Sequence, residues 1–115
     1  MNTVAKSMDF VRMIDSPYLQ VYPDIGNIKN GADDAVEDIL NGRGHIVAAH
    51  LKETRPGVYR DLMYGEGRVD FPACIDCLKT LGVRIYNAEF WYKPGADWHA
   101  DIAKAAAFLR PLLGG

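Results

Sequence analysis

Short apolar runs alternate with amphipathic segments along this sequence, and that alternation constrains the fold more than any other feature. Four segments carry apolar residues at the three- and four-residue steps of a helix face: residues 3–14, 35–40, 70–82 and 102–109. Three apolar runs suit buried strands: residues 19–22, 45–51 and 83–91. Strands that alternate with helices favour a parallel sheet, because each helix carries the chain back to the same edge. We therefore expect an α/β fold, in which a helix precedes three parallel strand–helix units.

Length and charge exclude several classes of protein. The chain has 115 residues, enough for one modest domain over residues 1–115, and a formal net charge of −2. That charge gives no long-range attraction for nucleic acid or an anionic membrane. No run approaches the ~20 apolar residues of a membrane span, and no signal-peptide pattern opens the chain. We expect no nucleic-acid or membrane partner, and the cytoplasm is the expected location.

The sequence holds two cysteines, Cys74 and Cys77, in a C-x-x-C arrangement. Such a pair can serve redox chemistry or bind zinc, although zinc sites of this kind carry a second pair. Here the two cysteines lie within an amphipathic helical pattern, where a free cysteine commonly behaves as a small apolar residue. We expect both to pack in the core.

An ionisable residue that can bind a metal lies at the end of each predicted strand: Asp24, His50 and Glu89. In parallel α/β folds, ligands bind at the carboxyl ends of the strands. Two carboxylates and an imidazole suit a divalent cation such as zinc, manganese, cobalt or magnesium. Each residue also has an ordinary explanation: Asp24 as a turn former, His50 as a core histidine, and Glu89 as a solvated strand end. Their joint placement favours a site.

Longer strings in the sequence resemble those of a known enzyme family. VYPDIGN, HLKETRPGVYRDLMYGEGRVDF and AEFWY are similar to the L-xylulose 5-phosphate (hexulose-6-phosphate) 3-epimerases, which are TIM barrels of the xylose isomerase-like group. The resemblance covers nearly the whole chain. It implies that the three strands correspond to strands six to eight of a (β/α)8 barrel, so that residues 1–115 form a C-terminal segment of it.

The resemblance also implies roles for the three strand-end residues. The family binds its divalent metal through two glutamates, an aspartate and a histidine, and the last three ligands of that set map to Asp24, His50 and Glu89. Its two glutamates form the acid/base pair, which makes Glu89 the expected catalytic residue. The first glutamate comes from the fifth strand and has no counterpart here, because Met1 falls in the following helix. We expect a segment with little activity by itself.

Other charged and aromatic residues lie near these strand ends. Lys52, Arg55 and Arg60 follow the His50 strand and could hold a hydroxyl or phosphate of the substrate, although a solvated basic loop would look the same. Trp91 could line the site or simply pack in the barrel. His45 and His99 match no motif ligand, and His45 is expected to be structural.

The expected function is that of a metal-dependent sugar-phosphate 3-epimerase acting through an enediolate. An isomerase that moves a carbonyl by the same chemistry is the closest alternative, and an inactive, self-associating α/β fragment is the other. Three parallel strands leave two unpaired sheet edges, and Val21, Val47, Ala49 and Ile85 were expected to form an exposed apolar face. A homodimer is therefore expected.

Overall fold

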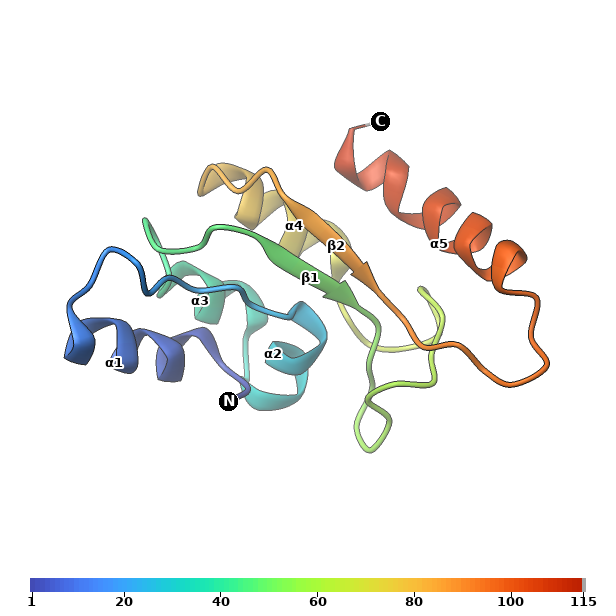
Figure 1. Cartoon of the computed structure of the whole chain (residues 1–115), viewed down its shortest axis with the longest axis horizontal. Coiled ribbons are helices and arrows are strands. Elements are labelled where there is room, and N and C mark those ends of the chain that lie inside the picture. Colours follow the sequence, from blue (N-terminus) through green and yellow to red (C-terminus); the bar gives the residue numbers. More distant parts are fainter. Residues whose placement is uncertain (115) are drawn as a thin grey trace.

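The computed structural model describes residues 1–114, in which five helices pack with a two-stranded parallel sheet (Figure 1). The elements are α1 (Val4–Ile14), α2 (Ile25–Gly31), α3 (Ala35–Leu40), β1 (Ala49–Lys52), α4 (Phe71–Thr80), β2 (Tyr86–Glu89) and α5 (Trp98–Leu113). The α/β class and the parallel pairing are confirmed. The strands are shorter than the apolar runs that predicted them, and α5 continues through Pro111 to Leu113, beyond the helical pattern that ended at residue 109.

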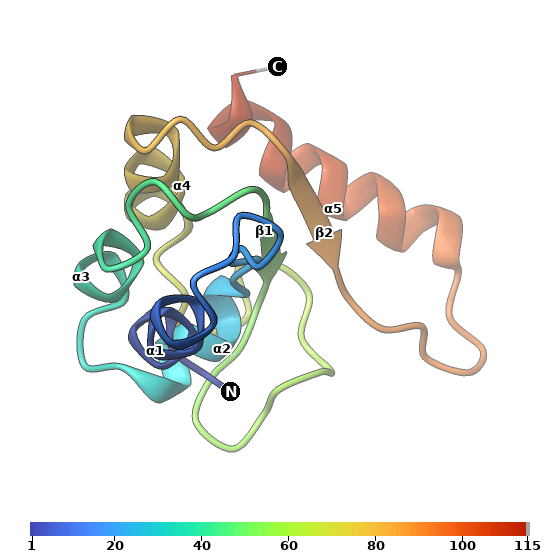
Figure 2. The ribbon, with the colours of Figure 1, turned by 60° about the vertical axis from the view of Figure 1, so that its left-hand side comes forward.

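The helices lie as a layer around one face of the sheet. Contacts run from α1 to α3, from α3 to α4 and from α4 to α5. Figure 2 shows α5 next to β2, at one end of this helical layer, and α1 and α3 at the other end. This order follows the chain and resembles part of the outer helical layer of a barrel.

Side-chain oxygens cap the helices and fix where they begin. Thr3 caps α1, and aspartates cap the other four helices at their first residues. Asp38 on α3 is buried, and its carboxylate accepts the backbone N–H groups of Val4 (2.6 Å) and Ala5 (3.1 Å). A carboxylate at a helix N-terminus satisfies free N–H groups and complements the helix dipole. This contact joins α1 to α3.

The prediction of a full strand at residues 19–22 is wrong. This segment makes only isolated parallel bridges, between Val21 and Ile46 and between Asp24 and His50. The proline at position 23 explains the interruption, because it has no N–H to donate to a ladder. Its carbonyl still accepts the N–H of His50 at 2.8 Å, so the segment stays beside β1. The sheet consequently has two strands and one bridged neighbour rather than three strands.

A second difference follows directly after Pro23. Helix α2 begins here, where the sequence predicted no helix; it is capped by Asp24 and buries Ile25 and Ile28. Gly26 permits the close packing of this helix on the end of β1. A Cβ at Gly26 would lie 2.6 Å from the carbonyl oxygen of Lys52 and 2.7 Å from Thr54 Cγ2, which is too close for any side chain.

Alternation along the strands separates a core face from an open face. Ala49 and Leu51 are fully buried against the helices. His50 pairs in register with Asn87, and Lys52 with Glu89, so these four residues share the opposite face. The expected exposed apolar face is only partly present: Val47 and Ile85 are exposed, at 54% and 64%, whereas Val21 and Ala49 are buried.

Both cysteines pack in the hydrophobic core, as predicted. Burial raises the pKa of the Cys74 thiol to about 12, which leaves it uncharged and unreactive at neutral pH. Of the helices described, none combines the length and apolar character that crossing a membrane requires.

Candidate metal centre

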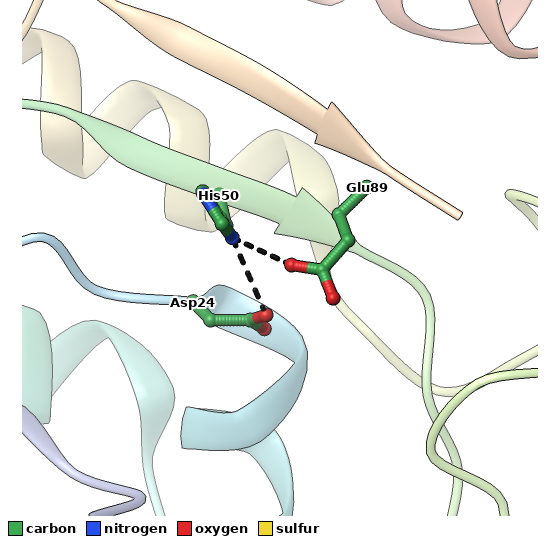
Figure 3. Close-up of side chains that lie close together, drawn as sticks. All are labelled: Asp24, His50 and Glu89. Carbon is green, nitrogen blue, oxygen red and sulfur yellow. Dashed lines mark hydrogen bonds and ion pairs between the residues drawn. The ribbon is translucent and has the colours of Figure 1, made fainter. Parts of the chain in front are cut away.

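Asp24, His50 and Glu89 converge at the carboxyl ends of the strands (Figure 3). One potential ligand atom from each residue lies within 4.8 Å of the other two. The distance from His50 Nδ1 to Glu89 Oε2 is 2.5 Å, and that from His50 Nδ1 to Asp24 Oδ2 is 4.0 Å. Three segments far apart in the sequence therefore place one carboxylate, one imidazole and a second carboxylate around one point.

Local structure fixes each of these side chains. Asp24 is the N-cap of α2, and its Oδ1 accepts the N–H of Asn27 at 2.9 Å, which leaves Oδ2 directed toward His50. His50 lies in β1, and Glu89 is the last residue of β2. The ring of Tyr22 packs edge-on against the imidazole, with the ring centroids 4.4 Å apart. The cluster thus rests on a helix cap and a paired strand end.

Asn87 bears on which nitrogen of His50 can bind a cation. Its side-chain amide lies 3.3 Å from His50 Nε2. An amide oxygen in that position would accept a hydrogen bond from Nε2–H and leave Nδ1 unprotonated, as a metal ligand must be. An amide nitrogen would have the opposite effect. Asn87 is compatible with either tautomer, whereas the ionised carboxylate of Glu89 can only accept a hydrogen bond from Nδ1–H, so a bound cation would replace that proton.

Lys52 lies inside the cluster. Its Nζ is 2.8 Å from Asp24 Oδ2 and 3.5 Å from Glu89 Oε1, and the side chain is 10% exposed. Partial burial pushes the pKa of Glu89 upward. The hydrogen bond with His50 and the positive charge of Lys52 outweigh that effect, so the pKa of Glu89 is lowered overall. Glu89 is therefore ionised at neutral pH, as both a metal ligand and a general base must be.

The other two basic residues predicted to bind substrate lie elsewhere. Arg55 and Arg60 are exposed on the loop after β1, and neither forms an ion pair within residues 1–114. The guanidinium of Arg60 lies 4.7 Å from the ring centroid of Trp91, so these two side chains stack at the edge of the loop. Of the three, only Lys52 is brought into the cluster.

The remaining histidines lie outside the group. His45 Nδ1 lies 3.2 Å from Gln20 Oε1, which supports the structural role expected for it. His99 is exposed at the start of α5 and stacks on Trp98.

Sequence reasoning missed the two residues that hold the loop between β1 and α4. The carboxylate of Glu53 is buried and accepts three backbone N–H groups, from Thr54 (3.1 Å), Gly65 (2.8 Å) and Val69 (3.2 Å). The hydroxyl of Tyr64 donates to the carbonyl of Leu51 at 2.6 Å. An acidic residue directly after a buried strand and before a glycine-rich loop was the only sequence signal for Glu53.

The residues of the cluster fit a divalent cation. Two carboxylates and one imidazole form a donor set used for zinc, manganese and related metals. Three protein ligands would leave positions open for further ligands, as in catalytic rather than structural metal sites. Among residues 1–114, the positive charges beside the carboxylates are the Lys52 ammonium and any proton on His50.

Comparison with known proteins agrees with this arrangement. The sequence model of the family described as "Xylose isomerase-like TIM barrel" matches residues 1–112. The chain belongs to that family. The family relation that the motifs suggested is therefore confirmed, and the partial α/β barrel is its fold.

Individual members of the xylose isomerase-like TIM barrel family show the same relation. The L-ribulose-5-phosphate 3-epimerase UlaE of Escherichia coli O139:H28 is 38% identical over 114 residues, which are 98% of this chain and 40% of UlaE. A solved L-ribulose 3-epimerase matches with a TM-score of 0.79 and 21% identity, covering 99% of this chain and 42% of the other. D-psicose 3-epimerase from Clostridium cellulolyticum H10 has a TM-score of 0.75 and 20% identity, with coverages of 98% and 44%. The two structural matches support the fold alone. The chain spans less than half the length of each of these relatives.

Proposed function

We propose that this chain supplies the metal-binding and proton-transfer part of a sugar-phosphate 3-epimerase. The convergence of Asp24, His50 and Glu89 at strand ends is the observation that carries the proposal. The relatives similar in sequence and fold act, by their names, on the third carbon of ketoses or ketose phosphates. From the motif resemblance we further propose that residues 19–22, β1 and β2 correspond to strands six to eight of a barrel and that the chain forms a C-terminal segment of it. The cytoplasm is the proposed location.

Each residue of the cluster has a proposed part in the reaction. Asp24, His50 and Glu89 would hold a divalent cation, which would polarise the ketose carbonyl and make the neighbouring carbon more acidic. Glu89 would accept the proton from that carbon or return one to it, because its carboxylate is ionised at neutral pH. Lys52 would bind an oxygen of the substrate from within the site, and Arg55 and Arg60, which are exposed on the loop after β1, would hold the phosphate.

Epimerisation requires a second acid/base group on the opposite face of the substrate. Glu53 does not serve, because its carboxylate is buried and both of its oxygens accept backbone N–H groups. Glu66 is exposed on the loop, where its Oε2 accepts the N–H of Met63 at 2.9 Å, and it is not part of the group formed by Asp24, His50 and Glu89. We propose that the second carboxylate comes from another barrel segment, as the resemblance implies.

A second copy of this chain is the proposed partner in solution. Within residues 1–114 no strand pairs with the outer edge of β2, and Ile85 and Val47 are exposed beside it. Free strand edges and exposed apolar side chains favour association. Twofold symmetry is the commonest way to close such a contact.

A chimeric enzyme tests the proposed function. Residues 1–115 would replace the matching segment of E. coli UlaE, and the chimera would be assayed with L-ribulose 5-phosphate and manganese. We expect 3-epimerase activity that is lost in the Glu89→Gln and His50→Ala forms and kept in the His99→Ala form. A folded chimera whose activity does not depend on Glu89 or His50 would contradict the proposal.

A further inference from the structure

A buried ammonium group occupies the candidate metal centre. Lys52 Nζ contacts a carboxylate oxygen of Asp24 at 2.8 Å and one of Glu89 at 3.5 Å, and only 10% of its side chain is exposed. Burying a lysine is costly unless its charge is paired. Strand register brings it there, because Lys52 is the last residue of β1 and lies opposite Glu89 in β2.

The contact with Asp24 involves the oxygen that a shared cation would need. Asp24 Oδ1 accepts the N–H of Asn27 and so caps α2. Oδ2 is the atom that faces His50 Nδ1, at 4.0 Å, and it is also the atom that Lys52 contacts. A cation bound by both Asp24 and His50 would therefore compete with the ammonium of Lys52 for the same oxygen, Asp24 Oδ2.

Electrostatic repulsion makes it unfavourable for the Lys52 ammonium and a divalent cation to share this oxygen. Without a metal, Lys52 neutralises part of the negative charge of two half-buried carboxylates and keeps them close together. With a divalent cation present, the ammonium becomes a like charge within a few ångströms of it. Repulsion between charges at that separation is strong in a partly buried site.

We propose that Lys52 is a built-in counter-cation that weakens divalent-metal binding at Asp24, His50 and Glu89, and that leaves Asp24 Oδ2 when a metal binds. The released ammonium then faces the open side of the cluster, where an anionic or hydroxyl oxygen of a sugar phosphate can accept its hydrogen bonds. Lys52 is thus a positioning residue that links metal loading to substrate binding. This inference rests on the proposed metal site and adds to it.

Calorimetric titration of the 115-residue chain with Mn²⁺ tests the inference. The Lys52→Met variant keeps an unbranched side chain but removes the charge, and Arg55→Met is the matched control because Arg55 is exposed and loses the same charge. We expect Lys52→Met to bind Mn²⁺ more tightly than the wild type, by a factor of about ten or more. Arg55→Met should differ from the wild type by about twofold or less.

Thermal unfolding gives an independent readout. Without metal, Lys52→Met should unfold at a lower temperature than the wild type, because the two carboxylates lose their counter-charge. Saturating Mn²⁺ should raise its midpoint by more than it raises that of the wild type. Lys52→Arg keeps the charge, so it should bind Mn²⁺ as weakly as the wild type. This variant provides the comparison if Lys52→Met does not fold without metal.

The outcomes separate this inference from the proposed metal site. If the wild type binds Mn²⁺, His50→Ala does not, and Lys52→Met binds no more tightly than the wild type, then the metal site stands and the role of Lys52 is wrong. If neither the wild type nor Lys52→Met binds Mn²⁺, both the site and this inference are overturned.

Discussion

His50 Nδ1 and Glu89 Oε2 lie 2.5 Å apart, although 39 positions separate the two residues in the sequence. The register of the parallel strands brings them together: His50 pairs with Asn87, and Glu89 lies two residues further along the same face of β2. The contact is therefore set by the backbone pairing and not by a flexible loop. A site held in this way is organised before any ligand binds.

The first prediction concerns His50 and the metal. Changing His50 to Ala removes the one proposed metal ligand that is a nitrogen atom. The affinity for divalent metal should therefore fall by a factor of about ten or more, the lower end of the losses seen when a metal site is disturbed. Titration of the wild type and of His50→Ala with Mn²⁺ and with Zn²⁺ measures this loss of affinity. His45→Ala is the control, since His45 contacts Gln20 outside the cluster and should leave the affinity unchanged. Equal binding by the wild type and His50→Ala would remove His50 from the site.

The second prediction concerns Glu53. The Glu53→Gln change replaces one carboxylate oxygen, which accepts backbone N–H groups, with an NH2 group that faces them. The free energy of unfolding should fall by about 1–3 kcal/mol, because a buried donor is left without an acceptor. Denaturant unfolding measures the change. Glu66→Gln should have less effect, because Glu66 is exposed and accepts one N–H group.

The third prediction concerns Tyr64 and alkaline pH. Burial raises the pKa of Tyr64 well above its ordinary value of about 10. The folded state therefore favours the neutral phenol, so this contribution to stability is complete below pH ~10 and is lost as the pH rises above it. Tyr64→Phe should cost about 1 kcal/mol at neutral pH by removing the bond to Leu51. It should also make the fall in stability above pH ~10 shallower than in the wild type, which unfolding curves at pH 8 to 11 would reveal.

The fourth prediction concerns the isolated chain. The 115-residue protein should show little or no 3-epimerase activity with L-ribulose 5-phosphate or L-xylulose 5-phosphate, because no second glutamate joins Asp24, His50 and Glu89 within residues 1–114. A coupled assay at saturating Mn²⁺ measures this, with full-length UlaE as the positive control. Robust turnover that survives in Glu53→Gln and disappears in Glu66→Gln would identify Glu66 as the second group instead.

Periodicity predicted the long elements well. The apolar spacing anticipated α1, α4 and α5, because each has enough turns to form a continuous buried stripe. The three proposed ligands could also be identified, since strands that end in ionisable residues place those residues at one edge of a parallel sheet. The distances among these three side chains could not be predicted from the sequence, because they depend on strand register.

The errors arise where tertiary contacts override local pattern. Helix α2 has seven residues and two glycines, so its apolar pattern is too short to recognise, and it depends on the cap at Asp24 and on burial of Ile25 and Ile28. The sequence predicts that Lys52 binds substrate or lies in a solvated basic loop, and its burial is unexpected because lysine is rarely buried. Its pairing with two carboxylates was visible only once strand register was known.

The last prediction concerns self-association through the open edge of β2. Ile85 is 64% exposed beside an edge that pairs with no strand in residues 1–114. We expect a dimer by light scattering at micromolar concentration, and we expect Ile85→Lys to shift it to a monomer, because a charge would be buried in the contact. Met13→Lys is the matched control: Met13 is 71% exposed on α1, so its replacement should leave the dimer intact. A wild-type monomer with a cooperative thermal transition would show that the open edge is stable in water and that no second copy covers it.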